Sequence, residues 1–336
     1  MALWIAVAVA VGFAMTNGLH DAANAIAALV ATRTATPAAA LALATVFNVL
    51  GPLLLGAAVA ETVAGIVTVG PTATVAVLGA ALTAAVTWNL VTWRFGLPSS
   101  SGHALVGGLV GAGLLEGGTA AINWGGFDGL RPVGVIGVLV AMAISPALGL
   151  GAGAVADRAG RRATRRATRR IEGPIRGGLW ASSAALAFSH GANDAAKSVG
   201  IIASLLVAGG FIPDLAATPN WVKVGSALAL TLGTALGGWT IVRTIGQRIF
   251  RIRPLDGLAL TGSSAVVIFG ASLLGAPVST TQVVASSVVG TGLGRRRVHR
   301  IRWRVVQEIG IAWIVTMPAT ALLAVLLTPL WRWLAS

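Results

Sequence analysis

Residues 17–24 read Asn-Gly-Leu-His-Asp-Ala-Ala-Asn, and residues 190–197 read His-Gly-Ala-Asn-Asp-Ala-Ala-Lys. Each stretch lies inside an apolar segment that is long enough to cross a bilayer. A carboxylate at that depth costs about 2.5–3.5 kcal/mol even on lenient insertion scales, so Asp21 and Asp194 are candidate functional residues. The recurrence of the pattern predicts a duplicated chain with a site between two repeats.

The composition indicates a polytopic membrane protein. Hydrophobic residues make up 56% of the 336 residues and charged residues 10%, against about 25% charged in a soluble domain. The chain has no cysteine, which excludes disulfides and thiolate metal sites. Its net charge of +14 does not indicate nucleic-acid binding, because the arginines cluster in short loops between apolar runs.

Hydropathy predicts ten membrane segments, and the basic loops give their orientation. The segments are 2–31, 38–60, 73–93, 97–115, 133–156, 178–208, 222–242, 255–275, 277–293 and 305–330. With both termini outside, nearly all loop arginines fall on the cytoplasmic side. They include Arg33, Arg94, Arg158, Arg161, Arg162, Arg165, Arg166, Arg169, Arg170, Arg176, Arg243, Arg248, Arg251, Arg253, Arg295, Arg296, Arg297, Arg300, Arg302 and Arg304.

Five segments in each half force the halves into opposite orientations. We therefore expect an all-α membrane protein of two inverted-topology repeats, with interrupted or re-entrant helices at the motifs. The first repeat covers 1–156, a basic cytoplasmic linker covers 157–177, and the second repeat covers 178–336.

A second pair of similar stretches places hydroxyl groups after a proline. Residues 96–103 read Gly-Leu-Pro-Ser-Ser-Ser-Gly-His, and residues 275–282 read Gly-Ala-Pro-Val-Ser-Thr-Thr-Gln. Proline suits a helix start, and Ser or Thr can cap the free backbone N–H groups. A helix start inside the bilayer with such hydroxyls is a good anion site. Hydropathy leaves open whether 97–115 and 277–293 span the membrane or re-enter.

Nearly all deep ionisable residues belong to the duplicated motifs: His20, Asp21, His103, His190, Asp194 and Lys197. This collection fits an anion site coupled to a cation, with the aspartates holding Na⁺ or H⁺ and the hydroxyls and Lys197 facing the anion. Two roles stay open for Lys197, an ion pair with Asp194 or contact with the anion. His20 is either a proton acceptor or a neutral hydrogen-bonding side chain.

Both Gly-x-x-Asp-x-x-Asn/Lys motifs and both Pro-x-Ser-Ser/Thr stretches resemble the signature repeats of the PiT family of inorganic phosphate transporters. The resemblance covers essentially the whole chain and implies symport of phosphate with H⁺ or Na⁺ at a site between the repeats. In this sequence Asp21, Asn24, Asn193 and Asp194 match the family's motif positions, and Ser100, Ser101, Ser279, Thr280 and Thr281 match its phosphate-binding hydroxyl stretches. Together with Lys197 and His20 from the residue argument above, the candidate phosphate-binding residues are Asn193, Lys197, Ser100, Ser101, Ser279, Thr280 and Thr281. The candidate coupling-cation residues are Asp21, Asp194, Asn24 and His20.

One departure from the family pattern bears on the coupling ion. The first motif has His20 where sodium-coupled members usually carry asparagine, which resembles the bacterial low-affinity, proton-coupled branch. We therefore expect a phosphate:H⁺ symporter of the bacterial inner membrane that works by alternating access, with a divalent metal as a possible companion of phosphate. We expect no resident metal or cofactor and no enzymatic activity, and a homodimer is possible.

Four rival functions remain open from the sequence. They are a sulfate permease or a Na⁺-coupled phosphate symporter on the same scaffold, an enzyme acting on a lipid phosphate, and an anion channel. The lipid-phosphate enzyme is disfavoured because the deep motifs contain no arginine and no carboxylate pair within one motif.

Overall fold

The computed structural model describes residues 1–55, 58–237, 242, 244, 249, 252–295, 299 and 301–336. Part of the topology prediction lies outside these residues, namely Arg243, Arg248, Arg251, Arg296, Arg297 and Arg300. Among the described residues, seven helices are long and apolar enough to cross a membrane. They confirm the predicted all-α, polytopic fold class.

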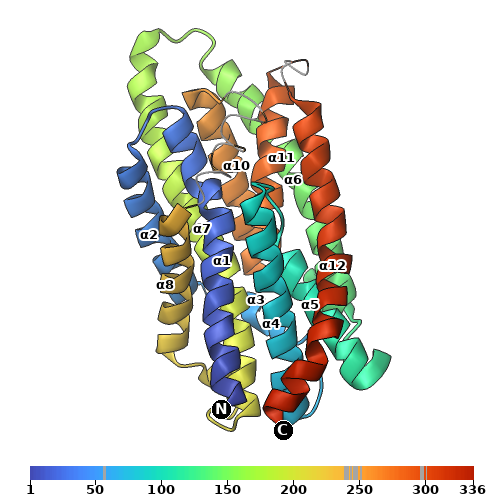
Figure 1. The fold of residues 1–336 in the computed structure, drawn as a ribbon. Coiled ribbons are helices and arrows are strands. Elements are labelled where there is room, and N and C mark those ends of the chain that lie inside the picture. The colour runs from blue at the N-terminus through green and yellow to red at the C-terminus, as the bar shows by residue number, and fades with distance from the viewer. Residues whose placement is uncertain are drawn as a thin grey trace.

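The described residues form ten helices of 15 or more residues (Figure 1). They are α1 (Ala2–Ala31), α2 (Pro37–Leu54), α4 (Pro71–Arg94), α5 (Ser101–Gly117), α6 (Gly134–Ala163), α7 (Glu172–Ala208), α8 (Asn220–Gly237), α10 (Pro254–Leu273), α11 (Thr280–Gly294) and α12 (Trp303–Ala335). The short elements are α3 (Ala58–Ala64), the 3₁₀ turns Gly118–Ala121, Arg169–Ile171 and Leu215–Ala217, and a hairpin of β1 (Gly126–Asp128) and β2 (Arg131–Val133).

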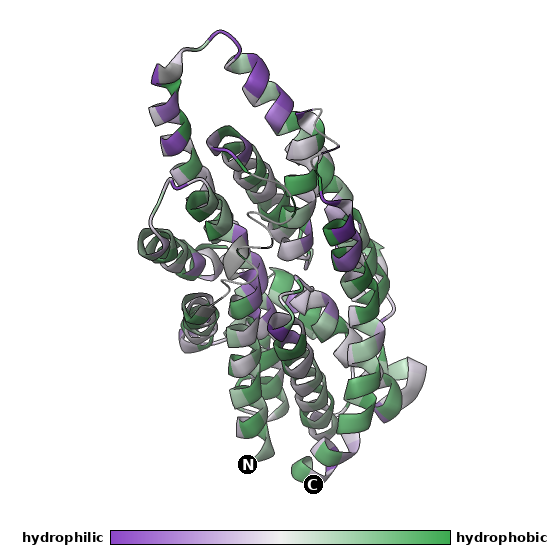
Figure 2. Cartoon of the chain, turned by 45° about the horizontal axis from the view of Figure 1, so that its top comes forward, coloured by the Kyte–Doolittle hydropathy of each residue, from purple (hydrophilic) through white to green (hydrophobic). Residues whose placement is uncertain are grey.

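Both chain termini lie at one end of the molecule, and the linker between α6 and α7 lies at the other (Figure 1). Helix α6 continues to Ala163 and α7 begins at Glu172, so both helices extend into the predicted linker 157–177. Figure 2 shows hydrophilic residues concentrated at this linker end and hydrophobic residues along the helices.

The predicted segment 38–60 is two helices in the structure. Helix α2 ends at Leu54, Leu55 is extended, and α3 begins at Ala58. Pro52 lies in the last turn of α2 and has no N–H to donate, which weakens the helix at this point. Hydropathy does not detect this break, because both helices are apolar.

The two prolines of the hydroxyl motifs do not start their helices. Pro98 and Pro277 each lie two residues before the true N-cap, which is Ser100 for α5 and Ser279 for α11. The cap serines adopt extended backbone conformations, and each side chain accepts a hydrogen bond from the N–H three residues later. The proline therefore fixes the approach to the helix, and the serine begins it.

Helices α5 and α11 begin near the middle of the molecule and run to opposite ends (Figure 1). The last turn of α5 contacts the C-terminal end of α12, where Arg332 donates to Glu116 at 2.5 Å. The end of α11 lies at the linker end, where Arg295 donates to Asp256 at 3.2 Å. Both helices therefore have their N-termini inside the protein, as the re-entrant alternative predicted.

The long helices of the two halves exchange packing partners. Helix α6 packs on α10 and α11, and α12 packs on α4 and α5. In the same way α2 packs on α7, and α8 packs on α1. Each half therefore buries part of its surface against the other half.

Glycines bring α1 and α8 to backbone contact. A Cβ on Gly18 would lie 1.9 Å from the carbonyl oxygen of Leu230, and one on Gly233 would lie 1.8 Å from that of Met15. Small residues at such crossings allow close van der Waals packing between membrane helices.

We expect Gly233→Ala to destabilise the protein by about 1–3 kcal/mol, because the added methyl group must push α8 away from α1. The measurement is the thermal unfolding midpoint of purified protein in detergent. Gly225→Ala is the matched control, since it lies on the same helix and its Cβ would meet no atom within 4 Å. Equal midpoints for the two variants would contradict the close crossing.

Candidate functional site

The duplicated motifs lie at the middle of α1 and α7, which pack against each other and run in opposite directions (Figure 1). Asp21 on α1 and Asp194 on α7 are 2% and 1% exposed. Both carboxylates are therefore buried, and one oxygen of each lies within 4.8 Å of the other in a group that includes His190.

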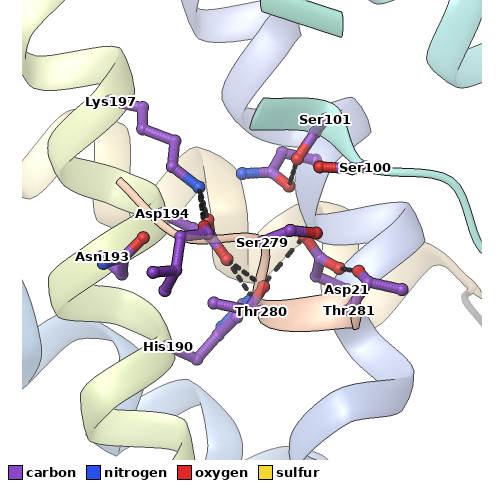
Figure 3. Close-up of polar contacts among 12 residues, drawn as sticks. Asp21, Ser100, Ser101, His190, Asn193, Asp194, Lys197, Ser279, Thr280 and Thr281 are labelled. Carbon is purple, nitrogen blue, oxygen red and sulfur yellow. Dashed lines mark hydrogen bonds and ion pairs between the residues drawn. The ribbon is translucent and has the colours of Figure 1, made fainter. Parts of the chain in front are cut away.

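The first turn of α11 contacts both carboxylates (Figure 3). Thr280 donates its hydroxyl hydrogen to Asp194 Oδ2 at 2.6 Å, and Thr281 donates to Asp21 Oδ1. Asn24 donates to Asp21 Oδ1 at 2.9 Å, and its amide also lies 3.4 Å from Thr280 Oγ1. One helix N-terminus thus connects the motif of α1 with the motif of α7.

Two nitrogen-bearing side chains surround Asp194. The Lys197 ammonium donates to Asp194 Oδ1 and, at 3.0 Å, to the carbonyl oxygen of Val278. His190 Nε2 lies 3.0 Å from Asp194 Oδ2 and 3.9 Å from Asp21 Oδ2. Of the two roles left open for Lys197, the structure shows the ion pair with Asp194.

The first turn of α5 lies beside α1. Ser101 donates to Asn17 Oδ1 at 2.6 Å, while Ser100 is the N-cap and accepts the N–H of His103. Ser279 caps α11 in the same way. All five predicted phosphate-binding hydroxyls therefore lie at the two helix N-termini, and in this structure each one is hydrogen-bonded to a protein group.

His20 and Asn193 lie outside the carboxylate cluster, although the sequence grouped them with it. His20 Nε2 lies 2.5 Å from the carbonyl oxygen of Asn89 on α4. Asn193, at the matching position of the second motif, donates to Ser272 Oγ at 3.1 Å and to the carbonyl oxygen of Ala276 at 3.0 Å. His20 therefore joins α1 to α4, the helix before α5, and Asn193 joins α7 to α10, the helix before α11.

Sequence reasoning missed Asn48 on α2, whose Oδ1 lies 3.0 Å from His190 Nδ1. It also gave no role to Asn17, although that residue belongs to the first motif. The sequence signal for both residues was a neutral amide inside an apolar segment. Such a group is a weaker signal than a charged residue, but when buried it also needs a hydrogen-bond partner.

The cluster offers ligands for both a cation and an anion. Asp21, His190 and Asp194 each provide one ligand atom, all within 4.8 Å of one another, so these three can hold a cation. Asn24 Oδ1 and Asn17 Nδ2 are buried without a hydrogen-bond partner among the described residues. The N-termini of α5 and α11 add free backbone N–H groups and positive dipole ends, which favour an anion.

The fold is that of a multi-pass membrane transporter. It matches a solved structure entitled "The sodium-dependent phosphate transporter" with a TM-score of 0.86 over 98% of both chains, at 23% sequence identity. The model of the phosphate transporter family matches residues 17–169 and 157–324. The chain belongs to this family.

Two curated bacterial relatives match along nearly their whole length. A protein of Rhizobium meliloti is 40% identical over 95% of this chain and 93% of its own, and one of Bacillus subtilis is 35% identical over 94% and 92%. Both are named "Probable low-affinity inorganic phosphate transporter". The predicted PiT resemblance and the prediction that the chain is not an enzyme are thereby confirmed.

Proposed function

We propose that this protein imports inorganic phosphate by symport with protons, through alternating access around the cluster of Asp21 and Asp194. Membership of the phosphate transporter family and the names of the bacterial relatives support phosphate as the substrate. Phosphate can accept several hydrogen bonds, and backbone amides, hydroxyls and the Lys197 ammonium are donors that can replace its water.

One observation carries this proposal: the first turn of α11 donates hydroxyl hydrogens to a carboxylate of each motif, through Thr280 and Thr281. A proton or Na⁺ on a carboxylate competes with such a donor. When the cation binds, the hydroxyl group is free to turn to an anion. Cation binding then favours phosphate binding, and phosphate binding favours cation binding to the same extent.

The antiparallel arrangement supports a mechanism with two inverted repeats. Helices α5 and α11 approach the cluster from opposite ends, and the helices around them exchange partners in a matching way. We propose repeats at 1–156 and 178–336 that rock against each other, with the linker end cytoplasmic because its loops are rich in arginine. The location proposed is the bacterial inner membrane.

The decisive experiment is uptake of radiolabelled phosphate into proteoliposomes under separately imposed proton and sodium gradients. We expect an inward proton gradient to accelerate uptake and a sodium gradient to leave it unchanged. If only the sodium gradient accelerated uptake, the coupling ion would be Na⁺ and not the proton. Uptake that ignores both gradients would contradict symport and favour a channel.

The choice of anion is tested in the same vesicles by adding unlabelled sulfate. We expect sulfate to compete poorly, because at neutral pH phosphate carries a proton that one of the aspartates can accept and sulfate carries none. Competition by sulfate at the concentration at which unlabelled phosphate competes would favour the sulfate permease.

A further inference from the structure

The first turns of α5 and α11 are joined to each other by their side chains. Gln282 Nε2 of α11 lies 3.2 Å from His103 Nδ1 of α5. An amide nitrogen can only donate, so His103 Nδ1 accepts and the ring hydrogen lies on Nε2. The proposed function gives neither residue a role.

His103 and Gln282 hold matching positions in the two half-length helices. Each is the third residue after its cap serine, and each gives its own backbone N–H to that cap, Ser100 or Ser279. Because His103 lies in the first turn of α5 and Gln282 in the first turn of α11, their hydrogen bond joins the N-terminal ends of the two helices. Gln282 is 3% exposed, so its amide is removed from water and its hydrogen bond is costly to lose.

The hydrogen bonds that hold the first turn of α11 to α1 and α7 are made by side chains proposed to bind the phosphate ion or the coupling cation. The first turn of α11 is held by hydroxyl bonds from Thr280 and Thr281 to the two aspartates. If a cation and phosphate take these groups, those bonds are released. The bond between His103 and Gln282 uses neither a carboxylate nor a predicted phosphate-binding hydroxyl, so it can persist when the site is loaded.

The Lys197 ammonium group lies close to the hydrogen bond between His103 and Gln282, because it is next to the first turn of α5. A methyl group on Gly102 would come within 3.3 Å of Lys197 Nζ, so the ammonium group lies against the first turn of α5. The same ammonium donates to the carbonyl oxygen of Val278, the residue before the cap of α11, at 3.0 Å, so it contacts the starts of both helices. Their separation depends on how α5 and α11 are joined.

We propose that His103 and Gln282 are positioning residues, which hold the N-termini of α5 and α11 at the spacing needed to bind one phosphate ion between them. The inference rests on the proposed function, because it concerns the affinity of that site. Loss of the bond leaves the binding groups in place but lets the two helix starts separate. The pair therefore sets the apparent KM for phosphate more than the maximal rate.

The test measures the initial rate of phosphate uptake into proteoliposomes against phosphate concentration. We expect His103→Leu and Gln282→Leu each to raise the KM about tenfold, the upper range for one lost hydrogen bond, with a maximal rate near that of the wild type. The double variant should be no worse than either single variant, because both remove the same bond. His103→Gln should restore the wild-type KM, since its amide oxygen can accept from Gln282.

His299→Leu and Gln307→Leu are the matched controls, because both side chains are exposed. A wild-type KM in both leucine variants, or effects that add in the double variant, would overturn the inference. Should a leucine variant fail to fold, His103→Asn and Gln282→Asn shorten the side chains without removing polarity and are expected to raise the KM in the same way. Failure of wild-type vesicles to take up phosphate would refute the proposed function itself, before any variant is compared.

Discussion

Asp194→Asn is expected to reduce phosphate uptake by about 100-fold or more, since an unpaired buried charge costs about 3 kcal/mol or more. Asp194 is 1% exposed and faces Lys197, His190 and the hydroxyl of Thr280. An asparagine fills the same space but cannot neutralise the ammonium group. It also cannot hold a coupling cation by charge.

The measurement is radiolabelled phosphate uptake in cells and in proteoliposomes, with the amount of inserted protein determined by immunoblot. Asp214→Asn is the matched control, because Asp214 is exposed and only caps a 3₁₀ turn, a role that asparagine also fills. Asp21→Asn should also abolish coupled uptake. It should destabilise the protein less than Asp194→Asn, because Asp21 has no ammonium partner as close as Lys197 is to Asp194. His190 Nε2 lies 3.9 Å from Asp21 Oδ2. Uptake by Asp194→Asn at the wild-type rate and pH dependence would remove this carboxylate from the mechanism.

Hydropathy predicted most of the helices, because it depends on local sequence. The membrane needs about 20 apolar residues per crossing, and the linker of α6 and α7 carries the expected arginines. The same reasoning joined α2 to α3, because an apolar composition persists through the break near Leu55. It also began these two segments at residues 97 and 277, at or next to the prolines, whereas the caps of α5 and α11 are Ser100 and Ser279.

The members of the site were predictable from their chemistry, but their pairings were not. Thr280 and Thr281 are neighbours in sequence and bond to aspartates on different helices, 86 and 260 residues away. Such pairing depends on how α11 enters between α1 and α7, which is a property of tertiary packing. His20 and Asn193 show the same limit, since their motif positions are right but their side chains turn to α4 and to the end of α10.

Lys197→Met is expected to destabilise the protein by about 3–5 kcal/mol, because it leaves Asp194 buried without its ammonium partner. Uptake should be lost as well, since Lys197 lies between the carboxylate and the first turn of α5. The midpoint of thermal unfolding in detergent, followed by tryptophan fluorescence, measures the first effect. Lys223→Met is the matched control, because Lys223 is partly exposed and lies on α8, outside both duplicated motifs.

The double variant Lys197→Met/Asp194→Asn separates folding from transport. Replacing both partners removes the buried charge pair together, so most of the stability lost in Lys197→Met should return. Transport should stay absent, because the site then lacks both a cation ligand and an anion donor. If Lys197→Met alone unfolds at the wild-type temperature, the ammonium does not stabilise Asp194. If the double variant transports phosphate, this pair serves the fold, and the coupling must reside in Asp21.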